Sequence, residues 1–405
     1  MRSSPVRKRV HSIAGQPSAR GIHRAMCARG VDEANRTATP LELLFDLTFV
    51  AAVAQLTGRL AHAITTGHAS SAAGAFLMVF FAIWWAWMNF TWFASAYDCD
   101  DVPYRLAAFV QMGGVLVLAA GIGPAFDTGD YAAVATGYLL MRVGLLSLWV
   151  RAAIQHPVGR ATCLRYASGV ALLQALWIAR LGLGDHAATG TFMALVGLEL
   201  LVPVWAERRG GTTWHPHHIA ERYALFTIIL LGEGVFAATT AVAAVVEDGA
   251  GPELVAVSVG GLAIVAALWW LYFAEPAGAG LEERRGWSYV WGYGHYVLFA
   301  ALAALGAGLE VVVAASARHA DDLASWKAVA AIAAPVAVVM VMVELLRIPK
   351  PGSFPHLGSH KAAALLALGV VVILADRTGL TIGACLVAVI TCVAVVADVV
   401  APSRR

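Results

Sequence analysis

Two short segments carry the residues best suited to chemistry, and the first is an acidic pair. Glu42 and Asp46 are four residues apart, so they share one face of a helix. Such a pair is suited to binding a cation or a proton at the mouth of a transport pathway. The alternative is structural, because acids in a first helical turn cap the helix and complement its dipole. Both interpretations stay open for both residues.

The second segment is a cluster formed by His217, His218, Glu221 and Arg222. His217 and Glu221 have the i, i+4 spacing that allows two side chains to share a metal ion. No second pair of ligands lies nearby in the sequence, and the H-E-x-x-H motif is absent. The pattern favours packing at the start of a helix, with Pro216 in the first turn, and we expect no metal site.

Three more charged residues, Arg142, Glu199 and Glu233, lie deep inside long apolar runs. A charged side chain at the centre of a bilayer costs about 2.5–3.5 kcal/mol, so each is expected to face other helices and find a partner. An arginine–glutamate pair that holds helices together is one interpretation, and charges along a transport pathway are the other. The pathway candidates are Glu42, Asp46, Arg142, Glu199 and Glu233.

The elements that position these residues follow from the composition. The chain has 405 residues, of which 60% are hydrophobic and only 13% are charged, and its mean hydropathy is +0.72. Soluble domains are about 25% charged, so the excess of apolar residues must face lipid. We predict an all-α, polytopic helical membrane protein with about 12 transmembrane helices, over runs at 42–63, 72–93, 104–123, 131–150, 166–179, 188–205, 221–246, 254–274, 289–314, 327–346, 362–375 and 380–400.

The basic residues predict the orientation of these spans. With the amino terminus inside, 22 Lys and Arg residues fall on the inner side and five on the outer side. Cytoplasmic loops carry such an excess, so we expect both termini in the cytoplasm and a multi-pass protein of the inner (plasma) membrane. Residues 1–38 are polar and basic with no apolar stretch, which predicts a disordered cytoplasmic tail.

The two halves of the chain resemble copies of each other. Trp84-Trp85 in the second run has a counterpart in Trp269-Trp270 of the eighth, and Glu42 has one in Glu221. We therefore predict six-helix repeats over 39–210 and 211–405, related by an axis along the membrane normal. The fifth and eleventh runs are both short and bounded by basic residues. Matching short spans indicate a binding site or pathway, although snorkelling basic side chains explain them equally well.

Four segments resemble the bacterial low-temperature-requirement A (LtrA) family. They read LELLFDLTFV at 41–50, WWAWMNFTWF at 84–93, DCDDVPYR at 98–105 and WHPHHIAERY at 214–223. The resemblance covers about residues 38–400 and implies a bacterial multi-span membrane protein, in a family named for a cold-growth phenotype.

From the duplication, the short spans and the buried charges we expect a transporter or permeation protein for a small solute or ion. The alternative is a membrane scaffold or sensor in cold or stress adaptation. The sequence shows no nucleophile–base set, phosphate loop or complete metal site, so we expect no enzyme, no cofactor and no nucleic-acid partner. Charges around one hydrated cavity would favour transport, whereas dry, paired charges would favour the scaffold.

Overall fold

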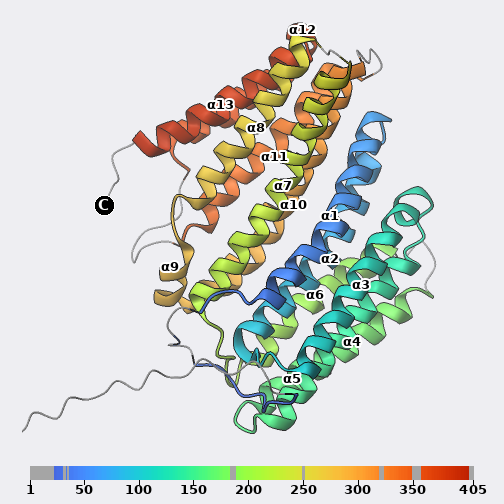
Figure 1. Cartoon of the computed structure of the whole chain (residues 1–405), viewed down its shortest axis with the longest axis vertical. Helices are drawn as coiled ribbons and strands as arrows, with labels where there is room; N and C mark the ends of the chain where they lie inside the picture. Colours follow the sequence, from blue (N-terminus) through green and yellow to red (C-terminus); the bar gives the residue numbers. More distant parts are fainter. Residues whose placement is uncertain are drawn as a thin grey trace, which may run out of the picture.

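The computed structural model describes residues 22–30, 33, 36–182, 188–248, 251–318, 323–348 and 357–400, and these form an all-helical fold (Figure 1). No strand occurs among them, and twelve of the helices have 20 residues or more, which confirms the predicted fold class. The helices are α1 (Pro40–Thr65), α2 (Ala69–Tyr97), α3 (Val102–Asp127), α4 (Ala132–Gln155), α5 (Arg160–Arg180), α6 (Ala188–Glu207), α7 (Pro216–Asp248), α8 (Pro252–Phe273), α9 (Ala277–Glu283), α10 (Ser288–Arg318), α11 (Ser325–Leu346), α12 (Ser359–Thr378) and α13 (Leu380–Val400).

Eleven of the helices are long and apolar enough to cross a membrane, and α5 is the long helix that does not qualify. It carries Arg165 within its second turn and Arg180 at its end. It nevertheless lies along α4 over the same depth. Tyr166 stacks on Trp149 with ring centroids 4.1 Å apart near one end, and Trp177 contacts Tyr138 at 6.4 Å farther along. The packing of α5 along α4 is consistent with the predicted twelfth span, which stays a prediction.

The outer surface of the bundle is apolar. Large hydrophobic side chains remain exposed along the helices, among them Phe236 (70%), Leu366 (74%) and Ile373 (79%). Apolar patches of this extent do not face water on a soluble monomer. The surface therefore fits a multi-pass protein whose solvent is lipid.

The two halves lie side by side, with α1 against α7 and α10 (Figure 1). In each half the third and fourth long helices pack at backbone distance, because small residues face each other. A Cβ on Gly114 of α3 would lie 2.6 Å from the carbonyl oxygen of Gly137 of α4, and a Cβ on Gly308 of α10 would collide with the carbonyl oxygen of Ala331 of α11. The predicted duplication, with repeats over 39–210 and 211–405, stays a prediction.

We call the end of the bundle at which α1, α3, α5, α7, α10 and α12 begin the basic end. Residues 22–30 cross it and are held by backbone hydrogen bonds. The Met26 amide donates to Gln155 Oε1 (2.8 Å), and the Arg29 amide donates to the carbonyl of Ala96 (2.9 Å). This part of the chain differs from the disordered tail predicted over 1–38, because the ends of α2 and α4 offer it partners. Residues 1–21 lie outside the described residues.

Candidate functional site

The acidic pair of α1 lies against the histidine-rich start of α7 and forms what we call the inter-half clamp: Glu42, Asp46, His218 and Arg222. The Arg222 guanidinium donates to Asp46 Oδ1 through Nη2 (2.6 Å) and to Oδ2 through Nε (3.0 Å), and its Nη1 lies 2.9 Å from Glu42 Oε1. His218 Nε2 lies 3.1 Å from Glu42 Oε1, and Trp87 Nε1 donates to Asp46 Oδ1 (2.7 Å). All four clamp side chains are buried.

The clamp joins α1 to α7 through direct contacts between buried side chains. Its two carboxylates are shared by one arginine in a two-pronged geometry, which is the strongest arrangement for such a pair. Glu42 also completes a capping box with Thr39, whose amide donates to Glu42 Oε2 (2.8 Å). Both observations favour the structural interpretation of Glu42 and Asp46 over a pathway mouth.

His217 and Glu221 do not face one partner. His217 Nε2 lies 3.2 Å from Glu282 on α9, and Glu221 Oε2 accepts a hydrogen bond from the amide of Ala38 (3.3 Å). Within the described part of the chain, no three His, Cys, Asp or Glu side chains converge as metal ligands would. The cluster at the start of α7 is therefore divided between the clamp and two separate surface contacts.

Arg142 of α4 and Glu199 of α6 form a second buried pair, with Nη2 2.7 Å from Oε2. The same carboxylate accepts hydrogen bonds from Trp85 Nε1 (2.8 Å), Trp177 Nε1 (3.1 Å) and the Tyr138 hydroxyl (3.2 Å). We call these five residues the central layer. It ties together α2, α4, α5 and α6 in the middle of the first half.

Glu233 lies apart from both groups. Thr57 of α1 donates to its Oε2 (3.3 Å), toward the end of the bundle opposite the basic end. The five pathway candidates therefore occupy three separate places, and no single cavity collects them. Arg142 and Glu199 both contact Tyr138, which lines a cavity of the first half.

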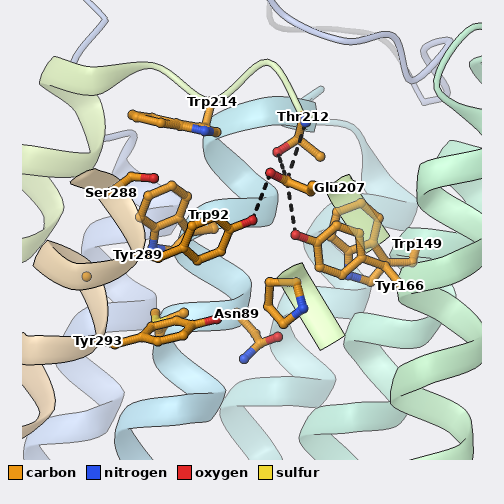
Figure 2. A pocket seen from close by; sticks show the side chains of 13 residues that line it. Asn89, Trp92, Trp149, Tyr166, Glu207, Thr212, Trp214, Ser288, Tyr289 and Tyr293 are labelled. Carbon is orange, nitrogen blue, oxygen red and sulfur yellow. Dashed lines mark hydrogen bonds between the residues drawn. The ribbon is translucent and has the colours of Figure 1, made fainter. Parts of the chain in front are cut away.

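A cavity of about 40 Å³ lies at the basic end between α2, α4, α5, α6 and α10, and we call it the basic-end cavity (Figure 2). One carboxylate, Glu207 at the end of α6, lies at its mouth. The hydroxyls of Tyr166 and Tyr289 donate to it from opposite sides (3.0 and 3.2 Å), and Thr212 Oγ1 donates at 2.6 Å. The remaining lining is largely aromatic and consists of Met88, Asn89, Trp92, Trp149, Pro203, Trp214, Ser288, Gly292 and Tyr293.

Sequence reasoning missed Glu207. A glutamate that ends a helix beside Arg208 and Arg209 has the pattern of an interfacial residue. One signal was available, because Glu199, Pro203 and Glu207 recur every four residues and so share one face of α6. Pro203 also leaves the carbonyl of Glu199 without its helical donor, since proline has no N–H.

A second cavity of about 290 Å³ opens between α2, α4, α5 and α6 on the far side of the central layer, and we call it the far cavity. Tyr138 and Trp177 belong to both the far cavity and the central layer. The rest of its lining is mostly apolar, with Gln174 and Arg180 as its longer polar side chains. The two cavities are therefore built on the same four helices and separated by one buried layer.

The short runs noted in the sequence differ in their surroundings. The fifth run forms α5, which lines both cavities through Tyr166, Gln174 and Trp177. The eleventh run forms α12, whose Lys361 is buried and paired with Glu344 and with Asp398 (2.5 Å). A pathway interpretation thus fits α5, whereas α12 fits a helix anchored by an ion-pair network.

Comparison with known proteins places the chain among bacterial membrane proteins. The family model described as bacterial low temperature requirement A protein (LtrA) matches residues 37–401. A protein of Rhizobium meliloti (strain 1021), described as uncharacterized, is 28% identical over 272 residues, which are 63% of this chain and 64% of that protein. The chain thus matches slightly less than two thirds of the length of this relative. No solved structure matches it significantly.

Proposed function

Because this chain belongs to the bacterial low temperature requirement A (LtrA) family, we propose that it transports a small solute through a route inside its first half. One observation carries the proposal: the basic-end cavity and the far cavity lie on the same four helices, at two depths, and the central layer lies between these depths. A transporter at rest is expected to hold such a route closed in the middle.

In this proposal the central layer closes the route between the two cavities. Glu199 lies eight residues from Glu207 on α6, which corresponds to about 12 Å along a helix. Its carboxylate is fully occupied by Arg142, Trp85, Trp177 and Tyr138. Breaking a buried ion pair costs about 3–5 kcal/mol, so the layer opens only when something else stabilises the separated charges. In this proposal the solute supplies that stabilisation.

The inter-half clamp is a fixed element in this scheme. It joins α1 to α7 away from both cavities, so α2, α4, α5 and α6 move against a frame that α1 and the second half provide. We also propose that the protein catalyses no reaction, since the polar groups of the route form hydrogen bonds and ion pairs without a nucleophile–base set.

A scaffold without transport is the second candidate, and the clamp favours it. Glu42, Asp46, His218 and Arg222 are buried and paired with one another, as expected of charges that only fasten helices. The two candidates make opposite predictions for solute flux.

Flux in proteoliposomes distinguishes them. Stopped-flow osmotic swelling is measured with urea, glycerol, acetate and methylammonium as the probes. We expect the wild-type protein to pass at least one of them faster than protein-free vesicles, and Glu199→Gln to change that rate about tenfold or more. Glu282→Gln, an exposed carboxylate at the basic end, is the matched control and should behave as wild type. Rates equal to those of empty vesicles for all four probes would favour the scaffold.

For the location we propose the inner membrane with the basic end in the cytoplasm, because the excess of Lys and Arg residues lies there. Cys27 is exposed at this end. A membrane-impermeant maleimide should label it in inverted vesicles and leave it unlabelled in intact cells. Labelling in intact cells would reverse the orientation.

A further inference from the structure

We infer that the basic-end cavity binds a small organic cation of the size of methylammonium or guanidinium, through the Glu207 carboxylate and the aromatic side chains around it. This inference rests on the proposed transport route and names the class of solute that enters it. Four features of the cavity support it.

The first feature is unbalanced charge. Glu207 is the only ionisable acid in the lining, and the lining contains no Arg, Lys or His. Among the described residues no basic side chain lies within ion-pair distance of it, whereas Arg142 neutralises Glu199 directly. Three hydroxyl groups donate to the Glu207 carboxylate, and none of them carries a positive charge. The cavity therefore carries one negative charge that a cation can neutralise.

The second feature is the supply of acceptors. The hydroxyl groups of Tyr166 and Tyr289 donate their protons to Glu207, so the lone pairs of the two hydroxyl oxygens stay available to an N–H donor. Asn89, at the inner end of the cavity in Figure 2, donates its amide to the carbonyl of Trp85 (2.7 Å), which leaves its own Oδ1 as an acceptor. An ammonium or guanidinium group has N–H donors for these oxygens, whereas an anion has none.

The third feature is the aromatic wall. Trp92, Tyr289 and Tyr293 line one side of the cavity and Trp149 and Tyr166 the other (Figure 2). A cation over an aromatic face is attracted by the ring quadrupole, most strongly where water is excluded.

One lining ring already holds a cationic group. The Arg285 guanidinium carbon lies 4.8 Å from the ring centroid of Trp214 at the mouth of the cavity. The ring of Trp214 is therefore placed so that a guanidinium can stack on it.

The fourth feature is size. A cavity of about 40 Å³ has room for roughly three water molecules. A methylammonium or guanidinium ion fits this space, whereas a peptide, a nucleotide or a sugar does not. Farther in, Glu199 is already held by the guanidinium of Arg142. A bound guanidinium-like ion would thus be chemically equivalent to the group that closes the route.

Equilibrium binding tests the inference independently of flux. The full-length protein in nanodiscs is titrated with guanidinium chloride and with methylammonium chloride at millimolar concentrations and constant ionic strength, and tryptophan fluorescence is recorded. We expect saturable binding of at least one of the two cations, and no response to sodium acetate. Glu207→Gln should weaken it by about tenfold or more, while Glu282→Gln, the matched control, leaves it unchanged.

A second variant keeps the test valid if Glu207→Gln fails to fold. Trp214→Leu changes a loop residue at the mouth and should weaken binding by about threefold or more. Absence of saturable binding of both cations to the wild-type protein would overturn the inference, as would equal binding by the wild type and both variants. Cation binding without flux of any solute would instead overturn the proposed transport and leave the cation site standing.

Discussion

The two halves of the molecule place matching tryptophans in opposite environments. Trp84 and Trp85 of α2 are 1% and 0% exposed, whereas their counterparts Trp269 and Trp270 of α8 are 46% and 52% exposed. In the first half the indoles are buried between helices. In the second half they face outward from the bundle.

Side-chain volume between two helices explains the difference. In the second half α8 packs closely on α13, because Gly260 lies against Ala388. A Cβ on Gly260 would lie 3.6 Å from the Cβ of Ala388. Cys385 and Cys392 of α13 also approach carbonyl oxygens of α8. In the first half, Trp85, Met88 and Trp92 hold α2 away from α6. Small residues therefore close the contact between α8 and α13, whereas large residues separate α2 from α6. The second half has a cavity of about 390 Å³ elsewhere, between α7, α8, α9, α10 and α11 at the basic end.

Removal of the arginine that joins the halves should have the largest effect. Arg222→Ala leaves Glu42 and Asp46 buried without their cation, which costs about 5 kcal/mol, at the upper end for a broken buried pair. We expect a large drop in the thermal unfolding midpoint in detergent, or no folded protein. Arg105→Ala, at an exposed ion pair with Asp100, is the control and should change the midpoint little. Equal effects of the two changes would contradict the role of the clamp.

Truncation of matching tryptophans compares the halves directly. Trp85→Ala removes a fully buried ring and a hydrogen bond to Glu199, at a cost of about 4 kcal/mol. Trp270→Ala removes a ring that is half exposed to lipid, and it should cost about 1 kcal/mol or less. The unfolding midpoints of the two variants measure the difference. If Trp270→Ala proved the more destabilising change, the contrast between the halves would be lost.

Carboxylates at the basic end should give the halves different pH dependence. Burial at the end of α2 and the nearby Glu42 raise the pKa of Asp98 to about 6, whereas Glu275, just after α8, is 68% exposed. A raised pKa favours the protonated form in the folded state. Asp98 therefore destabilises the fold increasingly between pH 4 and 6, with a full cost of about 3 kcal/mol above pH 6.

We accordingly expect the unfolding midpoint to fall as the pH rises from 4 to 7, and Asp98→Asn to flatten that fall. Glu275→Gln is the matched control and should leave the profile unchanged. An unaltered profile in Asp98→Asn would show that another group titrates.

The smallest effect is expected where small residues close a helix contact of the second half. Ala388→Leu overfills the contact between α8 and α13 and should cost about 2 kcal/mol. Leu198→Phe, at an exposed position on α6, is the control and should be tolerated. Equally small losses of unfolding free energy in Ala388→Leu and Leu198→Phe would contradict close packing between α8 and α13.

The sequence alone predicts much of the fold, because lipid leaves few alternatives for apolar runs of about twenty residues. It also requires that a buried Arg142 find a carboxylate, but it does not select Glu199 over Glu233. That choice depends on how α4 and α6 rotate against each other, which is set by packing across the whole half.

The clamp and the basic-end cavity lie still further from what the sequence predicts. Glu42 and Arg222 are separated by most of the first half, and their contact requires α1 to lie against α7. The surroundings of Glu207 depend on α10, because Tyr289 of α10 donates a hydrogen bond to the Glu207 carboxylate. Contacts between distant segments of this kind have no periodic signature in one sequence.

Side-specific thiol labelling tests the central claim, a route through the first half. In a background without the native cysteines, Ser288→Cys places a thiol at the basic-end cavity, Thr136→Cys at the far cavity and Ser258→Cys on α8, buried in the second half. We predict that a small, charged methanethiosulfonate labels the first from one side of the membrane, the second from the other, and the third from neither. Labelling of Ser258→Cys as fast as the other two, or no labelling of either cavity position, would contradict the account.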